Sequence, residues 1–334
     1  MAVLPWKSAT ARHLTGLRRA AGCGAVAVRV AARAAVGYEV RVDLSGIGIW
    51  SGELRYGDAD EKRDAAAELE ALGYRALWIP DVGGDVFGAL RDLLDATTTI
   101  VAATGILNLW MHSAADVGTG LAALDADHPG RTLLGIGVSH ALLIDQSHPG
   151  EYAKPLSVTR NYLDQLDAAS PTVPADRRVL AALGPKMLEL SRDRAAGAHP
   201  YLVTPEHTAV ARAALGDGAL LLPEQHVVLE TDPARARAVG RESLSVYLQL
   251  PNYVNNWRRL GFSEDDFADG GSDRLVDHVV VWGDEATIAT RVQAHLDAGA
   301  DHVCVQACTG AERTDFPRAE WRALAPALVG LTRR

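Results

Sequence analysis

Two glycine-bearing turns follow apolar runs in this sequence, and both could hold a ligand. The segment 181–187 (AALGPKM) passes from a predicted strand into a predicted helix. Pro185 suits the first helical position, and the N–H groups of Lys186, Met187 and Leu188 are then expected to be unpaired at the helix start. Such a start binds phosphate, and Lys186 adds positive charge. An ordinary strand-to-helix turn would explain the same spacing equally well.

The second turn is the run 135–140 (GIGVSH), in which two glycines close an apolar run. Glycine lets a flat ligand approach the backbone, and Ser139 and His140 would then lie at the same edge of a sheet. The run 104–108 (TGILN) also carries a glycine near a strand end, which is typical of a bulge or a strained bond. Each pattern is weak evidence when taken alone.

Histidines are the candidate acid–base groups. None of the eleven follows a metal spacing such as His-Glu-x-x-His, so the sequence predicts no metal site. Four lie near predicted strand ends, where a histidine could exchange protons: His112, His140, His199 and His226. Each could instead be an ordinary surface or core residue. No Gly-x-Ser-x-Gly elbow is present, which disfavours hydrolase chemistry.

The elements that would position these residues alternate between short apolar runs and helical patterns. Asp58 or Asp60 can cap a helix that Gly73 ends, and a second helix around 288–296 ends at Gly299. About eight strands are predicted, at 45–50, 74–80, 100–107, 132–138, 178–183, 199–203, 220–229 and 302–307. This alternation predicts an α/β fold, a single closed (β/α)8 TIM barrel over 44–334. An open doubly wound sheet is the competitor, although no Gly-x-Gly-x-x-Gly follows the first strand.

Two segments stand outside this alternation. The stretch 247–277 before the last strand is long enough to be a lid or an interface. Residues 1–43 form a basic, Ala/Arg-rich extension, with six basic side chains and one acidic one in the first forty positions. We expect this extension to be disordered or to reflect a start codon placed too far upstream. A targeting signal and an ordered element are the alternatives.

Composition limits the class of protein. The chain has 334 residues, of which 48% are hydrophobic and 22% charged, so it can bury a sizeable core. No apolar run approaches the roughly 18 residues of a membrane helix. The net charge of −9 disfavours nucleic acid as a partner. Three cysteines favour a reducing cytoplasm over secretion.

Taken together, several ordered motifs resemble the luciferase-like monooxygenase superfamily, and specifically its coenzyme F420-dependent oxidoreductase branch. The motifs are 46–50 (GIGIW), 73–80 (GYRALWIP), 103–106 (ATGI), 130–140 (GRTLLGIGVSH) and 182–187 (ALGPKM). The resemblance extends from about residue 44 to residue 307. Each motif is loose, but their order is fairly specific.

The resemblance implies a deazaflavin bound at the carboxyl ends of the strands, and a cis peptide bond at Gly105-Ile106 behind its ring. It places Asp81 and His140 beside the ring as the catalytic candidates. The cofactor-binding residues that it implies are Asp81, Gly105, Ile106, Asn108, Gly137, Ser139, His140, Gly184, Pro185, Lys186 and Met187. The expected substrate contacts are His112, His199, Tyr253, Asn255 and Trp257.

One position departs from the family pattern. Many relatives have histidine directly after the acidic residue that ends the second strand, whereas this chain has Val82. We expect His140 to take over proton transfer, with His112 and His199 as further candidates. The expected function is hydride transfer between coenzyme F420 and a small organic substrate, in a cytoplasmic homodimer. The alternatives are an FMN-dependent monooxygenase of the same fold and a non-catalytic F420-binding barrel.

Overall fold

The computed structural model describes residues 42, 44–81, 83–147, 150, 152–310 and 315–334. The predicted extension 1–43 therefore lies almost entirely outside the described residues, as does Val82. Among the described helices, none combines the length and the apolar character needed to cross a membrane.

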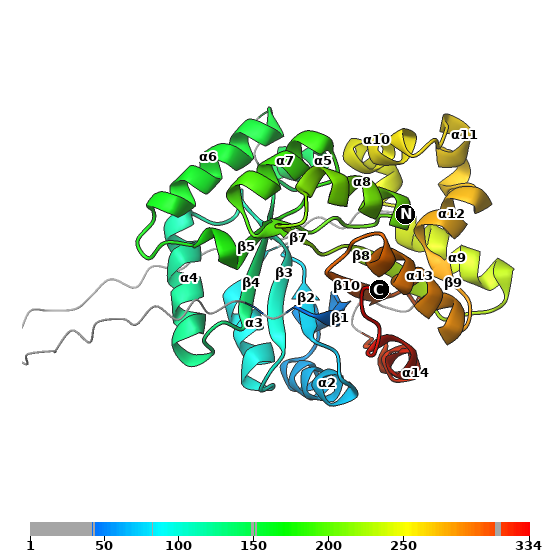
Figure 1. The fold of residues 1–334 in the computed structure, drawn as a ribbon, viewed down its shortest axis with the longest axis horizontal. Coiled ribbons are helices and arrows are strands. Elements are labelled where there is room, and N and C mark those ends of the chain that lie inside the picture. The colour runs from blue at the N-terminus through cyan, green and yellow to red at the C-terminus, as the bar shows by residue number, and fades with distance from the viewer. Residues whose placement is uncertain (1–41, 43, 82, 148–149, 151, 311–314) are drawn as a thin grey trace, which may run out of the picture. The chain divides into compact units, whose positions relative to one another are not determined.

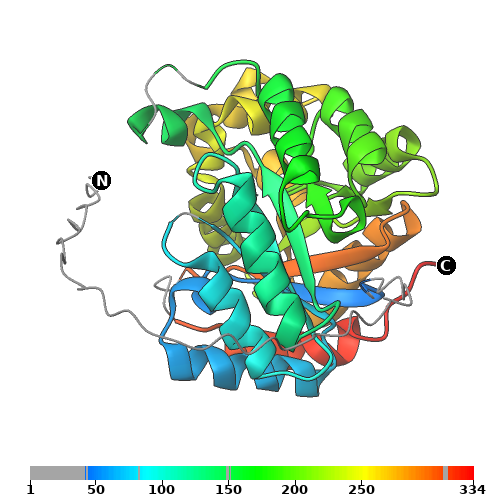
Figure 2. The same cartoon turned by 90° about the vertical axis from the view of Figure 1, so that its left-hand side faces the viewer.

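All strand pairs in the structure are parallel, and they form one curled sheet with helices on its outside (Figures 1 and 2). The strands follow the order β7-β6-β5-β4-β3-β2-β1-β10-β8-β9. Their bounds are β1 Gly46–Trp50, β2 Ala76–Ile79, β3 Val101–Asn108, β4 Thr132–Gly137, β5 Arg178–Leu180, β6 Gly197–Ala198, β7 Leu220–Leu221, β8 Glu224–Val228, β9 Val281–Trp282 and β10 His302–Ala307.

Residues 220–228 close this sheet into a ring. β7 pairs with β6, and the N–H groups of Leu222 and Glu224 donate to the carbonyls of Ala198 and Pro200. β8 follows directly in the chain and pairs with β10, which pairs with β1. One stretch of chain thus joins both edges of the sheet, and the ring consists of β1 to β6, the β7–β8 stretch and β10. The predicted (β/α)8 TIM barrel is confirmed.

The helices begin and end where the sequence supplies caps. The carboxylate of Asp58 accepts N–H bonds at the start of α2, and Gly73 ends that helix in the left-handed region, at φ +97°. The helices are α1 Glu53–Tyr56, α2 Ala59–Leu72, α3 Val86–Asp95, α4 Ala114–Asp127, α5 Ala141–Ser147, α6 Pro155–Ala168, α7 Pro185–Arg194, α8 Pro205–Leu215, α9 Pro233–Leu244, α13 Glu285–Asp297 and α14 Arg318–Leu328, with the short 3-10 helix η1 Ala175–Arg177.

The insertion before the last strand is helical and has its own apolar cluster. Its elements are η2 Tyr247–Gln249, α10 Pro251–Arg259, α11 Glu264–Phe267, η3 Ala268–Gly270 and α12 Asp273–Val279. Trp257, Phe262 and Leu275 are buried among these elements and contribute to one cluster with Val228 of β8. In Figure 1 these helices lie together on one side of the barrel.

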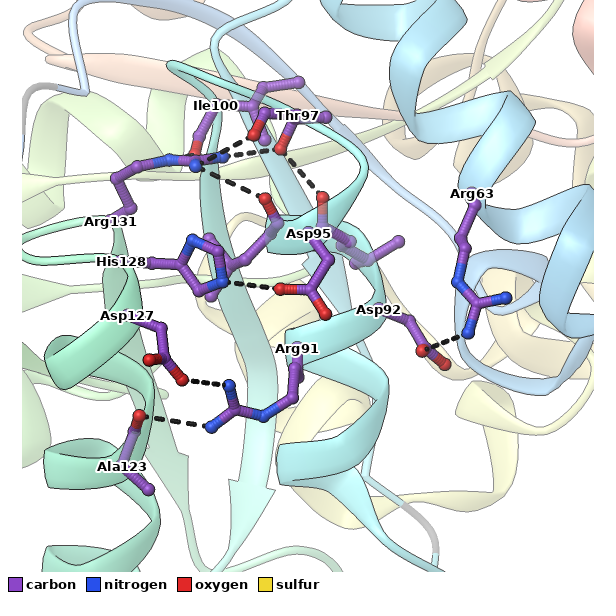
Figure 3. A network of polar contacts seen from close by, with 12 residues as sticks. Arg63, Arg91, Asp92, Asp95, Thr97, Ile100, Ala123, Asp127, His128 and Arg131 are labelled. Atoms are coloured by element: carbon purple, nitrogen blue, oxygen red, sulfur yellow. Dashed lines mark hydrogen bonds and ion pairs between the residues drawn. The ribbon is translucent and has the colours of Figure 1, made fainter.

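Polar contacts fasten the helices at the amino-terminal end of β3 and β4 (Figure 3). Arg131, just before β4, donates to the carbonyls of Leu94, Thr97 and Ile100. Ion pairs join α2 to α3 through Arg63 and Asp92, and α3 to α4 through Arg91 and Asp127. This end of the barrel is therefore occupied by structural contacts, and the opposite end carries the predicted site residues.

Candidate functional site

The mouth of the barrel, where the strands reach their carboxyl ends, is accessible at two places along otherwise buried strands. β3 is buried on both sides of Gly105 and Ile106, and these two residues are partly exposed. The last residues of β10, Gln306 and Ala307, are also partly exposed. The bond Gly105-Ile106 is cis, as the resemblance implied, and the Gly105 carbonyl accepts a hydrogen bond from Trp50 Nε1 at 3.0 Å.

Five rings from five elements form one side of the mouth, which we call the aromatic wall. They are Trp50 at the end of β1, Tyr201 after β6, His226 on β8, Tyr247 in η2 and Tyr253 on α10. The Tyr201 ring lies 5.3 Å from Trp50 and 5.4 Å from His226, measured between centroids. Tyr247 lies 5.0 Å from Tyr253, and the Tyr201 hydroxyl donates to Gln306 Oε1 at 2.7 Å.

A carboxylate lies directly behind this wall. Glu224 and His226 are two residues apart on β8, so both side chains point into the barrel. The His226 Nδ1 atom lies 2.8 Å from Glu224 Oε1, and Glu224 Oε2 accepts the Leu202 N–H at 2.9 Å. Burial, together with the neighbouring Tyr247 and Glu224, raises the pKa of Tyr253 well above its usual range. The Tyr253 hydroxyl is therefore protonated at neutral pH.

Two further histidines lie deeper in the barrel. His199 stacks on Trp78 with centroids 4.3 Å apart, and its Nδ1 donates to the Leu222 carbonyl. Its Nε2 has no hydrogen-bond partner within the described part of the chain, and a Cβ built on Gly105 would lie 3.2 Å from that atom. Burial lowers the pKa of both His199 and His302 to about 4, so both rings are neutral at pH 7.

The structure brings together Asp81, Asn108 and His112, three residues that the sequence singled out. The Asp81 side chain is fully buried, and its Oδ2 accepts the Asn108 backbone N–H at 3.1 Å. The same oxygen lies 2.8 Å from His112 Nε2. The Asp81 carboxylate therefore holds the chain that leaves β3, next to Gly105 and Ile106.

Ser139 and His140 follow β4 at the rim of the mouth. Ser139 has a left-handed backbone, at φ +56°, and its carbonyl accepts a bond from the Tyr152 hydroxyl. His140 Nδ1 lies 3.2 Å from Asn252 Oδ1, and the ring is 5.5 Å from that of Tyr253. Burial lowers the pKa of His140, although the contact with Asn252 opposes this, so the ring is neutral at pH 7. Gly137, before them, leaves room for Ile106, since a Cβ there would lie 2.9 Å from that side chain.

The start of α7 follows β5 at the same end of the barrel. Gly184 is the N-cap, without a side-chain cap, and Pro185 occupies the first turn as predicted. The expectation of three unpaired N–H groups is corrected, because Met187 and Leu188 both donate to the Gly184 carbonyl. The N–H of Lys186 has no partner among the described residues.

Space in front of this helix start is open. A Cβ built on Gly184 would have only one atom within 4 Å, the Arg259 Nη2 at 3.9 Å. The Lys186 side chain is exposed and lines a surface hollow between α6 and α7 with Arg160 and Glu189. The cation nearest to Gly184 is therefore Arg259 from α10, a residue that the sequence did not single out.

The three residues expected to cover a substrate occupy different environments. Tyr253 belongs to the aromatic wall. Asn255 is exposed, and its Oδ1 accepts a bond from Arg258. Trp257 is fully buried and packs against Tyr253 and Phe267, so it is a core residue of the insertion.

Sequence reasoning missed Trp50, Tyr201, Tyr247, Glu224 and Arg259 as site residues. A signal existed for Glu224 only, since its spacing from His226 places both on one face of a strand. The others reach the mouth from the end of β1, from the loop after β6 and from the insertion. Within the described residues, no group of three or more His, Cys, Asp or Glu side chains is arranged to hold a metal ion.

A closed parallel barrel covered by helices defines a TIM-barrel protein, and in enzymes of this fold the active site lies at the carboxyl ends of the strands. The model of the luciferase-like monooxygenase family matches residues 43–302, and the chain belongs to this family. The comparison with curated protein sequences gives no match.

Solved structures with similar folds include enzymes with two kinds of cofactor. An F420-dependent secondary alcohol dehydrogenase in complex with an F420-acetone adduct has a TM-score of 0.66 and 12% identity, covering 85% of this chain and 99% of that chain. The coenzyme F420-dependent tetrahydromethanopterin reductase from Methanopyrus kandleri has a TM-score of 0.60 and 15% identity, covering 87% and 99%. The oxygenating constituent of 3,6-diketocamphane monooxygenase from Pseudomonas putida, in complex with FMN, has a TM-score of 0.63 and 13% identity, covering 87% and 98%. At these identities the likeness establishes the fold.

Proposed function

We propose that this protein is an F420-dependent oxidoreductase that transfers a hydride between the deazaflavin and a small organic substrate. The observation that carries the proposal is the pairing of two features at one end of the barrel. A flat ring can approach β3 at the partly exposed Gly105 and Ile106. A phosphate-bearing tail can reach the open start of α7 at Gly184.

The residues at the helix start suit an anionic tail. The Lys186 N–H is a donor without a partner among the described residues, and the amino-terminal end of a ten-residue helix favours negative charge. The Arg259 guanidinium adds a positive charge beside Gly184. When bound there, the cofactor would supply the hydride chemistry.

The chain's own residues would then orient the reactants and would accept or donate the proton of the substrate. The Asp81 carboxylate fixes the backbone at Asn108, and Trp50 fixes the Gly105 carbonyl, so the surface that receives the ring is held from both sides. The aromatic wall would limit access of water to the substrate. Two imidazoles border the mouth and could exchange a proton with the substrate. They are His140 at the rim and His226 in the aromatic wall.

The similarity to an F420-dependent secondary alcohol dehydrogenase supports alcohols and ketones as the first substrates to test. The similarity to an FMN-containing monooxygenase makes FMN the competing cofactor. The two cofactors share a flat tricyclic ring and a phosphate, so the same mouth has to be tested with both.

Equilibrium titration of the purified protein tests the proposal. We expect oxidised F420 to be bound, with its fluorescence quenched, and FMN to be bound more weakly. Mixing the F420-loaded protein with 2-propanol or cyclohexanol should then bleach the absorbance of the oxidised deazaflavin. Preferential binding of FMN would support the monooxygenase instead, and F420 binding without bleaching by any alcohol or reoxidation by any ketone would support a carrier.

A further inference from the structure

Glu224 and His226 form an almost fully buried acid–base pair behind the aromatic wall. Both side chains are at most 1% exposed. A buried carboxylate is costly unless hydrogen bonds satisfy it. Glu224 receives two, from the Leu202 N–H and from His226 Nδ1, and it forms no ion pair with any described Arg or Lys.

This contact fixes the roles of the ring nitrogens. An ionised carboxylate can only accept hydrogen bonds, so His226 Nδ1 carries the proton that it donates to Glu224. The Nε2 atom is then the one that can gain or lose a proton, and it has no hydrogen-bond partner among the described residues. A carboxylate that holds one nitrogen of a histidine also stabilises the cation that forms when the other nitrogen is protonated.

The His226 ring lies within the aromatic wall. Tyr201 and Tyr247 stand perpendicular to it, at 5.4 and 6.1 Å between centroids. Tyr201 is in turn 5.3 Å from Trp50, whose Nε1 is bonded to the Gly105 carbonyl. His226 is thus connected through two rings to the place where the cofactor ring is proposed to lie.

His140 has a weaker arrangement for proton transfer. Its Nδ1 contacts the neutral amide of Asn252, an exposed residue at the start of α10. An amide can orient the ring, but it does not compensate the positive charge of a protonated histidine as a carboxylate does.

We infer that His226 is the catalytic acid–base residue of the site, and that Glu224 is its positioning residue. This inference rests on the proposed function. In the oxidation of an alcohol, His226 Nε2 would accept the proton of the hydroxyl. The bound deazaflavin would supply the acceptor for the hydride from the carbon, and a carbonyl would form. In the reverse direction His226 returns the proton to the carbonyl oxygen.

The same surroundings indicate the class of substrate. Gln306 and the aromatic wall, apart from His226, have uncharged side chains. The His226 ring is paired with the Glu224 carboxylate. A buried carboxylate behind the wall opposes the entry of a second anion. The site therefore fits an uncharged alcohol or ketone better than a hydroxy acid.

Steady-state kinetics on the F420-loaded protein test the assignment, with 2-propanol, cyclohexanol and lactate as probes. We expect His226→Ala to lower kcat/KM for the neutral alcohols by about 10²–10⁴-fold, with F420 affinity unchanged. Glu224→Gln keeps the shape of the side chain and removes its negative charge. This variant should lower kcat more than it raises KM. Added imidazole should restore part of the rate of His226→Ala, which a purely structural role would not allow. His278→Ala, an exposed histidine paired with Glu206, is the matched control.

A measurement without cofactor complements the kinetics. In ¹⁵N-histidine NMR of the unloaded protein at neutral pH, we expect the His226 proton on Nδ1 and a changed signal in Glu224→Gln. A proton on Nε2 alone would overturn the inference, as would wild-type turnover in His226→Ala or a loss of turnover confined to His140→Ala. Failure of the proposed function can be distinguished from failure of the His226 assignment. If the proposed function fails, the wild-type protein does not quench F420 fluorescence.

Discussion

The surroundings of each histidine decide its chemistry in this barrel. His302 uses both ring nitrogens, donating to the Leu44 carbonyl and accepting from Trp78 Nε1, so it is a structural residue. His199 uses one nitrogen, and His226 pairs one with a carboxylate. The sequence predicted that histidines lie near strand ends. It ranked His140 first for proton transfer, but it could not show the partners that distinguish the histidines, because those partners lie far away in the chain.

Arg259 gives a prediction at the scale of one residue. Arg259→Gln should weaken F420 binding by about tenfold, because the tail at Gly184 would lose a charge-assisted contact. Binding of the deazaflavin chromophore without its phosphate-bearing tail should not change. Fluorescence titration with both ligands measures the difference.

The neighbouring Arg258 supplies the control for this experiment. It is exposed and forms an ion pair with Glu264, so Arg258→Gln should leave both affinities unchanged. Equal weakening of both ligands by Arg259→Gln would place the phosphate elsewhere.

Elements with local signals were predicted well, and elements that depend on distant partners were not. The caps at Asp58 and Gly73 are local, and α2 has the predicted bounds. The strand predicted at 199–203 was wrong, since β6 comprises only Gly197–Ala198. In the predicted stretch, Leu202 has a left-handed φ of +56° and gives its N–H to the Glu224 side chain, so the backbone leaves the sheet. The two-residue strand β9, which pairs with β8, was not predicted.

The packing of β1 against its neighbours gives a prediction at the scale of elements. A Cβ on Gly48 would lie 2.7 Å from both His302 Nε2 and the Ala76 carbonyl. Gly48→Ala should therefore lower the free energy of unfolding by about 1–3 kcal/mol, as measured by urea denaturation. Gly218→Ala is the control, since a Cβ there meets nothing within 4 Å. Equal stability of both variants would contradict the packing described for the barrel interior.

For the whole molecule, the alternation of strand and helix patterns was sufficient to predict the closed barrel. The motifs at the ends of β3, β4 and β5 predict a site at its mouth, and the structure brings these strand ends together at one end of the barrel. The aromatic wall could not be predicted, because three of its rings come from the loop after β6 and from the insertion. Their positions depend on how the apolar cluster around Trp257 packs against β8.

Three buried histidines give a prediction for the stability of the whole molecule. Burial lowers the pKa of His199 and His302 to about 4 and that of His295 to about 3, against 6.5 for an ordinary histidine. The unfolded chain then binds more protons below pH 6.5, so the folded state loses stability as the pH falls from 6.5 toward 4. Each histidine contributes a slope of up to about 1.4 kcal/mol per pH unit.

Urea denaturation between pH 7.5 and 4.5 measures this slope. Stability should be nearly constant above pH 7 and should fall below pH 6.5. Glu70, whose pKa is lowered to about 2, contributes mainly below pH 4.5 and does not obscure the window. Stability that stays flat down to pH 4.5 would show that these histidines do not titrate as described.

The two sides of the mouth come from separate stretches of the chain. Residues between 81 and 187 form the surface at β3, β4 and the start of α7, whereas Tyr201, His226, Tyr247 and Tyr253 follow later. Under the proposed function, mutations of the three tyrosines in the later stretch would therefore change which molecules react, while the earlier stretch and Arg259 would keep the coenzyme bound. A library randomised only at Tyr201, Tyr247 and Tyr253 would be expected to change substrate specificity while the coenzyme-binding residues stay the same.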